Sequence, residues 1–266
     1  MIKILFFGDI VGRIGRQALV KSLPYLKNKY QPDLIIGNVE NLAHGKGVTE
    51  KTLSEIHSAG IDLFTSGNHI WRRDEIHDIL KKKKFSLLTP QNDPRTEGHQ
   101  GVQTLEVGNN KIVVINLLGR VFMNEENIKC PFKSIDKILT DTAKEAPAAI
   151  IVDFHAEATS EKKAMGWHLD GRVSAVVGTH THIATADTQI LPRGTGYITD
   201  LGMVGPIDSV LGIDKDKVIK KFLTDDKIIF DIPTEGQVGI DAVYLEINPE
   251  NGKTTKIEKI FEEVTI

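Results

Sequence analysis

Cysteine is nearly absent from this sequence. Its 266 residues include a single cysteine, Cys130, so the chain can form no internal disulfide and no metal site built from several thiolates. So low a cysteine content is compatible with a reducing compartment. We therefore expect a cytoplasmic protein whose chemistry depends on other side chains.

The sequence also lacks long apolar runs and a strong excess of one charge. The first apolar stretch, residues 4–7, ends at Gly8, and none approaches the roughly 18 apolar residues of a membrane span, so we expect neither a signal peptide nor a membrane segment. The 33 basic and 36 acidic residues give a formal net charge of −3. A general nucleic-acid binder usually carries a basic excess, so any RNA contact is expected to be secondary.

What the sequence does contain is a regular alternation of apolar runs and amphipathic segments. Hydrophobic residues make up 40% and charged residues 26% of the chain, which suits a globular protein, and we expect one domain over residues 1–266. Apolar runs predict strands at residues 2–8, 34–36, 61–65, 104–107, 111–117, 148–154, 173–177, 185–191, 196–200 and 242–247, the last of which closes the chain. Helical periodicity predicts helices at residues 19–30, 48–59, 73–84, 134–146 and 214–223.

Strands and helices alternate in the first half of this order, and strands dominate the second half. Such an order favours an α/β (α+β) layered fold with mixed β-sheets flanked by helices. Gly12, Gly15 and Arg16 predict a turn before the first helix. Pro24 is expected to bend or break that helix.

Two histidines follow the predicted strand at residues 173–177. His180 and His182 stand two positions apart, so an extended backbone would direct both imidazoles from the same face toward one point. Neutral imidazole is a common nitrogen ligand of late first-row metals. A His-x-His pair alone is more often a surface or hydrogen-bonded core feature, so its meaning depends on the other strand ends.

Other predicted strands end in polar side chains that could also bind a metal. These residues are Asp9, Glu40, Asn41, Asn68, His69 and His155. Taken singly, each has a structural alternative, such as capping a helix, supporting a turn or hydrogen bonding within the core. Open α/β sheets bind ligands beyond the carboxyl ends of their strands, so the joint occurrence predicts one common site.

These residues and their surroundings resemble the motifs of calcineurin-like metallophosphoesterases, and more closely those of the YmdB-like branch. The matching motifs are Gly8-Asp9, Gly67-Asn68-His69, His155 and the Gly-Thr-His-Thr-His segment 178–182, with further similarity at residues 152–160, 166–182 and 197–206. The similarity covers nearly the whole chain. It implies the four-layered metallophosphoesterase core and a bacterial dinuclear-metal phosphodiesterase.

The sequence differs from the wider superfamily in two motifs. Val11 stands where the usual Asp-x-His motif has a histidine, and Glu40 supplies the acidic residue of the usual Gly-Asp-x-x-Asp motif. Both differences are shared with the YmdB-like branch, whose pattern has an asparagine after the glutamate. Asn41 is therefore expected to fill the position left by the missing histidine.

The resemblance implies two metal ions bridged by Glu40. One ion would be held by Asp9, Glu40, Asn41 and His182, and the other by Glu40, Asn68, His155 and His180. Nitrogen and oxygen donors without thiolate suit iron or manganese, with zinc or cobalt as alternatives. Two divalent ions would exceed the charge of the two carboxylates by about two positive units, which suits hydroxide and phosphate oxygens.

The expected reaction is hydrolysis of phosphodiesters by metal-hydroxide attack on phosphorus, with 2′,3′-cyclic nucleotides as the substrates that the resemblance suggests. His69 would be the general acid for the leaving alkoxide, and the alternative is that it packs beside Trp71. The resemblance also suggests a homo-oligomer, and the lack of long apolar runs gives no reason to expect a membrane partner. Two other functions stay open: a broader phosphatase or phospholipase-like hydrolase, and a regulatory protein of low turnover that binds a phospho-ligand or RNA.

Several arginines and loop histidines are weaker candidates. Surface or structural pairing is the expected role of each arginine, although any of them could contact phosphate, and the two histidines could line the site. These residues are Arg13, Arg16, Arg120, Arg172, His44 and His99.

Overall fold

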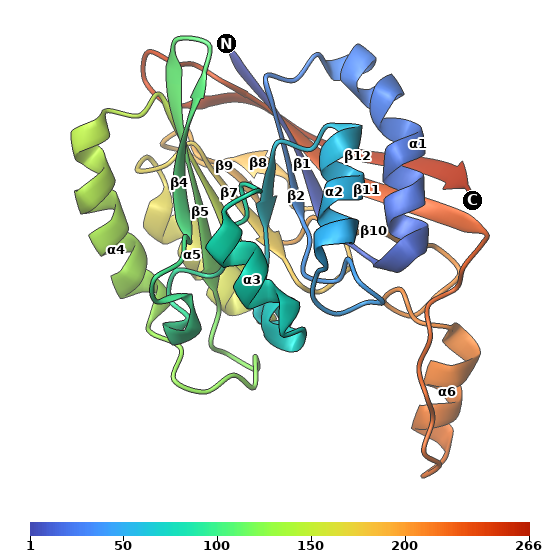
Figure 1. The fold of residues 1–266 in the computed structure, drawn as a ribbon. Coiled ribbons are helices and arrows are strands. Elements are labelled where there is room, and N and C mark those ends of the chain that lie inside the picture. The colour runs from blue at the N-terminus through green and yellow to red at the C-terminus, as the bar shows by residue number, and fades with distance from the viewer.

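The chain folds into two β-sheets that pack face to face between two layers of helices (Figure 1). The computed structural model describes residues 1–266. Alternate side chains of the first strand show the layering: Ile4 and Phe6 are buried between the sheets, whereas Leu5 and Phe7 are buried beneath helices. The predicted layered α/β fold with mixed sheets is confirmed.

The first sheet has the N-terminal strand near its centre. Its order is β12-β11-β10-β1-β2-β3, with an additional pairing between β11 and β1. The strands are β1 (Ile2–Ile10), β2 (Leu34–Asn38), β3 (Leu63–Thr65), β10 (Met203–Pro206), β11 (Gln237–Ile247) and β12 (Thr254–Thr265). Because β1 runs parallel to β2 and β10, their carboxyl ends lie at the same edge.

The second sheet has a parallel centre with an antiparallel strand at each edge. Its order is β4-β5-β6-β7-β9-β8. The strands are β4 (Val102–Val107), β5 (Asn110–Leu118), β6 (Ala149–His155), β7 (Ala175–Thr179), β8 (Gln189–Ile190) and β9 (Gly196–Ile198). Strands β5, β6, β7 and β9 are parallel neighbours, so their carboxyl ends also meet at one edge.

Helices cover the outer face of each sheet. The first sheet is covered by α1 (Gly12–Tyr30), α2 (Glu50–Ala59) and α3 (Glu75–Lys82), and the second by α4 (Pro131–Thr142) and α5 (Thr159–Leu169). Three short 3-10 helices are η1 (Asn68–Arg72), η2 (Pro94–Thr96) and η3 (Ala143–Glu145). None of the helices combines the length and the apolar character that crossing a membrane would require.

Helix α1 differs from its prediction in two ways. It begins at Gly12, where a turn was expected, and it continues through Pro24. The proline is tolerated because it lies on the exposed side of the helix, where water can hydrate the carbonyl of Val20 that loses its hydrogen bond. Leu23 and Leu26 are buried on the other side and keep the helix packed on the sheet.

Two strand predictions are also wrong. The strand at residues 242–247 does not close the chain, because β12 follows and pairs with β11 along its length. Most side chains of β12 are at least partly exposed and many are charged, as an edge strand allows, so its sequence carries little of a buried strand's apolar pattern. The predicted strand at residues 185–191 is reduced to the two-residue β8.

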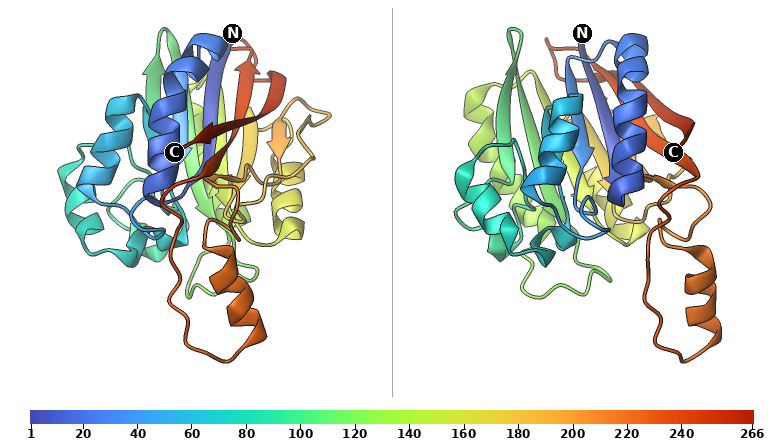
Figure 2. Two further views of the ribbon diagram at one scale, coloured as in Figure 1. Left: turned by 90° about the vertical axis from the view of Figure 1, so that its right-hand side faces the viewer. Right: turned by 45° about the vertical axis from the view of Figure 1, so that its right-hand side comes forward.

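A segment between β10 and β11 leaves the body of the protein. Residues 207–236, called the arm below, include helix α6 (Lys215–Leu223), which projects away from both sheets (Figure 2). Val218 is buried in this helix, whereas Ile219, Phe222 and Leu223 are exposed. The arm leaves at the end of the sheets where the predicted site residues lie.

Candidate metal centre

The predicted ligands gather at the carboxyl ends of parallel strands from both sheets. Asp9 lies near the end of β1 and Glu40 follows β2, whereas His155 ends β6 and His180 follows β7. Asp9 and His155 are fully buried, and Glu40 is 1% exposed. The packing of the sheets therefore brings four residues that are distant in sequence into one buried site.

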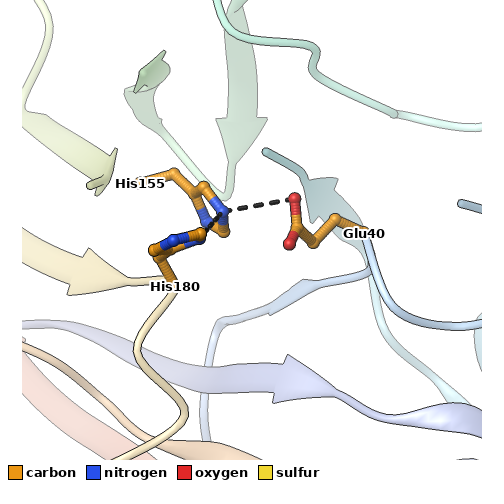
Figure 3. Close-up of side chains that lie close together, drawn as sticks. All are labelled: Glu40, His155 and His180. Carbon is orange, nitrogen blue, oxygen red and sulfur yellow. Dashed lines mark hydrogen bonds and ion pairs between the residues drawn. The ribbon is translucent and has the colours of Figure 1, made fainter. Parts of the chain in front are cut away.

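Glu40, His155 and His180 form the tightest cluster (Figure 3). His155 Nε2 lies 3.2 Å from Glu40 Oε2 and 2.9 Å from His180 Nδ1. One potential ligand atom from each of the three residues lies within 4.8 Å of the other two. A carboxylate with two imidazoles is a suitable donor set for a divalent first-row metal.

A hydrogen-bonded chain behind His155 sets the orientation of its ring. The Thr179 hydroxyl donates to Asp153 Oδ1 at 2.7 Å, so it accepts from His155 Nδ1 at 2.8 Å. With the proton on Nδ1, the lone pair of His155 Nε2 faces the cluster, as metal binding requires. Burial raises the pKa of Asp153 to about 6, which still leaves an ionised acceptor at neutral pH.

His180 presents Nδ1 to the cluster, whereas His155 presents Nε2. Its Nε2 lies 3.2 Å from Glu157 Oε2 and can donate to it, so Nδ1 faces His155 with a lone pair. Burial, and then the neighbouring His155, lower the pKa of His180 to about 3, so this ring is neutral at pH 7. His155 Nε2 and His180 Nδ1 are 2.9 Å apart, so they can share one proton, and a metal ion could take the place of that proton. The geometry is therefore compatible with a metal ion at this point.

The carboxylates of Glu40 and Asp9 give the site a negative field. Although burial opposes its charged form, Glu40 and then Asp9 raise the pKa of His155 to about 9. Burial raises the pKa of Asp9. At Glu40, burial is opposed by the charges and hydrogen bonds of His155 and His69, which together hold the pKa of that carboxyl well below its usual range. A proton on His155 offsets this negative field, and a bound divalent cation would displace that proton.

Asn41 and His182 form a second group beside the first. His182 Nδ1 donates to the backbone carbonyl of Leu211 at 3.0 Å. This contact turns His182 Nε2 toward Asn41 Oδ1 at 3.2 Å and toward Asp9 Oδ1 at 3.9 Å. His182 and His180 thus face different groups of donors. This arrangement supports their assignment to different metal ions, which stays a prediction.

The expectation that the backbone stays extended at the histidine pair is wrong. His180 and His182 have φ values of 107° and 62°, which cost about 1–2 kcal/mol each for residues with a Cβ. Backbone hydrogen bonds to buried carboxylates stabilise this conformation. His180 N–H donates to Asp9 Oδ2 at 3.0 Å, and Thr181 N–H donates to Asp200 Oδ2 at 3.1 Å.

Several features of the site fit a bound metal. Asp9 Oδ1 and Asn68 Oδ1 are buried and have no hydrogen-bond partner, a state that costs about 1–3 kcal/mol per group if nothing else satisfies the oxygen. Gly67 leaves the space beside the cluster open, because a Cβ there would collide with His155 and Glu40. Unpaired oxygens, inward-facing imidazoles and this opening together make the residues compatible with metal ions.

Comparison with known protein families identifies the group to which this chain belongs. The family model described as YmdB-like protein matches residues 5–260. The chain belongs to the YmdB-like family. A relative from Bacillus subtilis named 2′,3′-cyclic-nucleotide 2′-phosphodiesterase is 45% identical over 258 residues, which are 97% of this chain and 96% of the relative. The resemblance inferred from the motifs is confirmed.

Solved structures of similar proteins show the same fold. A phosphatase from Mycoplasma pneumoniae matches with a TM-score of 0.92 and 36% identity, covering 98% of this chain and 93% of that chain. NAD nucleotidase from Haemophilus influenzae shares the fold with a TM-score of 0.59 and 13% identity, covering 99% of this chain and 56% of that chain. The predicted metallophosphoesterase fold is confirmed.

In this YmdB-like protein, His69 lies against the cluster. Its backbone N–H donates to Glu40 Oε2 at 3.0 Å, and its Nδ1 lies 3.1 Å from Glu40 Oε1. The side chain is 23% exposed and lines a cavity above the ligands. Trp71, the alternative packing partner, instead donates to Asp93 and lies beside His77. This position suits a group that exchanges a proton with a substrate in the cavity.

The sequence analysis did not identify two buried charged residues, Asp153 and Lys162, that lie behind the predicted ligands. Asp153 is a charged residue inside an otherwise apolar strand, a pattern that indicates a structural or functional role. Lys162 pairs with Asp200 and donates to the carbonyl of Thr179 at 2.7 Å, so it supports the backbone that leads from β7 to the histidines. Helix α5 was not predicted because its buried face includes Glu161 and Lys162 instead of a continuous apolar stripe.

The weaker candidates separate into residues that line a pocket and arginines that form ion pairs or are exposed. Arg13 and His44 line the cavity above the ligands, whereas His99 lines a different pocket. Two of the other arginines form ion pairs with surface carboxylates at 2.8 and 2.7 Å, and the third is exposed. These arginines are Arg16, Arg172 and Arg120.

Proposed function

We propose that this chain is a metal-dependent phosphodiesterase that hydrolyses 2′,3′-cyclic nucleotides. The observation that carries the proposal is the cluster of Glu40, His155 and His180, two of them buried and the third partly exposed, whose donor atoms lie within 4.8 Å of one another. A cavity of about 740 Å³ lies above it, which is within the size range of small-molecule sites. The name of the Bacillus subtilis relative, at 45% identity, supports this class of substrate.

The proposed metal ligands are the seven residues that the sequence analysis predicts. Asp9, Glu40, Asn41 and His182 would hold one ion, and Glu40, Asn68, His155 and His180 would hold a second. Iron or manganese is proposed because the donors are carboxylate, amide and imidazole without thiolate, although zinc and cobalt accept the same donors. When bound, such a pair lowers the pKa of water and neutralises negative charge on the phosphoryl oxygens.

The protein's own groups orient the substrate and move one proton. Glu40 Oε1 lies 3.1 Å from His69 Nδ1, so a protonated His69 can donate Nδ1–H to this carboxylate and keep Nε2–H for the substrate. The Nε2 proton would pass to the ribose oxygen as its bond to phosphorus breaks. His69 is therefore the proposed general acid.

Removal of metal tests the proposed activity. Protein stripped with a chelator is expected to hydrolyse neither 2′,3′-cyclic AMP nor bis(p-nitrophenyl) phosphate, and Mn²⁺ is expected to restore both activities. Chromatography of the nucleotide and absorbance of p-nitrophenolate measure the two rates. Asn68→Ala is the matched variant, in which Mn²⁺ should restore little activity. Hydrolysis without metal, or no hydrolysis of any ester, would contradict the proposal.

A broader phosphatase is the competing function, and the name of the Mycoplasma pneumoniae structure favours it. The monoester p-nitrophenyl phosphate distinguishes the two. If the metal-loaded protein hydrolyses this monoester with a higher kcat/KM than the cyclic diester, the phosphatase is the better description. If it binds cyclic nucleotides without turnover, a regulatory role is the better description.

We also propose that copies of this chain associate through the arm. Phe222 and Leu223 are large apolar residues that are 86% and 79% exposed on the projecting helix α6. Clustered apolar side chains of this kind are typical of interaction surfaces. Light scattering measures the assembly, and a mass of 29.4 kDa at all concentrations tested would contradict the proposal.

A further inference from the structure

The cavity above the predicted ligands is lined by two chemically different groups of residues. Glu40, His180 and His182 are polar and would face the phosphoryl group. The arm supplies apolar residues, which a cyclic phosphate by itself would not need. The apolar residues that the arm contributes are Leu211, Ile213, Phe230, Ile232 and Pro233.

The arm has two limbs, the outgoing limb before helix α6 and the returning limb after it. Both limbs contact the body of the protein at this cavity. The outgoing limb is held where the carbonyl of Leu211 accepts from His182 at 3.0 Å. The returning limb is held by Ile232, which fills a notch between Gly12 and Gly45. A Cβ added to either glycine would lie 2.9 Å from Ile232 Cδ1. The arm therefore has a defined position beside the site, although its outer helix projects away from the body.

The two limbs are also tied to each other next to Phe230. Asp214 N–H donates to the carbonyl of Asp231 at 2.9 Å, and Lys217 pairs with the Asp231 carboxylate at 2.6 Å. Phe230 stands between these contacts and the tip of the arm and is 46% exposed, although it lines the cavity. An aromatic ring of this size, held in place by its neighbour and left partly open, is suited to stacking with a flat apolar group.

We propose that Phe230 is a specificity-determining residue that packs against the base of the nucleotide. This inference rests on the proposed phosphodiesterase activity, and it assigns the recognition of the nucleobase to the arm. Stacking of a base on an aromatic side chain does not depend on the pattern of hydrogen-bonding groups, so purine and pyrimidine substrates should both benefit. Arg13 and Lys46 add positive charge to the same cavity wall, which favours entry of an anionic substrate.

Phe230→Ala tests this assignment. The variant is expected to lose about 10-fold in kcat/KM for 2′,3′-cyclic AMP, mainly through a higher KM. A methyl ribofuranoside 2,3-cyclic phosphate, which lacks the base, should be a correspondingly poor substrate of the unchanged protein and should be unaffected by the substitution. Phe230→Trp should restore the KM for cyclic AMP, because it restores an aromatic surface.

Phe261→Ala is the matched control, because Phe261 is 51% exposed on β12 and is not among the cavity residues. It is expected to keep both activities. The inference is overturned if Phe230→Ala leaves cyclic AMP hydrolysis unchanged, or if it lowers kcat equally for the substrates with and without a base. If the proposed phosphodiesterase activity itself is wrong, the unchanged protein will hydrolyse neither compound, so the two failures can be distinguished.

Discussion

Replacing Glu40 by glutamine is expected to lower the metal content below two ions per chain and to reduce hydrolysis of 2′,3′-cyclic AMP by at least about 100-fold. Glutamine keeps the shape of the side chain but removes one of the two ligand carboxylates. Glu40 Oε2 lies 3.2 Å from His155 Nε2, so the lost charge is at the centre of the cluster. Elemental analysis of dialysed protein measures the metal per chain.

A carboxylate outside the site provides the control for this substitution. Glu55 pairs with Arg16 at 2.8 Å and is partly exposed, so Glu55→Gln is expected to keep both metal content and activity. Thermal melting shows whether each variant is folded. Retention of two ions by folded Glu40→Gln protein would contradict the bridging role of Glu40.

Replacing His69 by asparagine is expected to keep both metal ions but to reduce turnover of 2′,3′-cyclic AMP by about 100- to 10,000-fold, the usual contribution of a general acid. The ribose alkoxide is a poor leaving group that needs a proton. p-Nitrophenolate is a good leaving group, so hydrolysis of bis(p-nitrophenyl) phosphate should fall much less. The ratio of the two losses is the measurement that identifies the acid.

His77→Asn is the matched control, since His77 is exposed on α3 and does not line the cavity. It should change neither rate. Two results for His69→Asn would count against the role of His69. One is equal loss with both substrates, which would indicate a role in binding or in the structure of the site. The other is unchanged hydrolysis of the cyclic nucleotide.

The strand ends were the most predictable part of the site. Asp9 and His155 stand at or next to the last residues of β1 and β6, and a polar residue at the end of a buried strand is a local signal that needs no knowledge of the rest of the chain. Predictions failed where exposure or pairing decided the structure. Pro24 is accommodated because it faces solvent, and β12 forms because β11 offers it a complete set of backbone partners.

The orientation of the two imidazole rings could not be predicted from the motifs. The spacing of His180 and His182 predicted two side chains on one face, but positive φ values send them to different groups. Their orientation depends on Glu157 and on the carbonyl of Leu211, which lies 29 residues beyond His182. Contacts over such distances follow from how the loops pack, which local periodicity does not describe.

The sequence by itself determined the family and supplied the predicted donor residues and their order along the chain, because these depend on residue type and local pattern. Only the tertiary structure decided that Asp9 and Glu40 of one sheet would meet His155 and His180 of the other. Burial of apolar side chains between the sheets imposes that meeting, and it acts between residues more than a hundred positions apart. The place of the arm beside the cavity was decided in the same way, by the packing of Ile232 against the body.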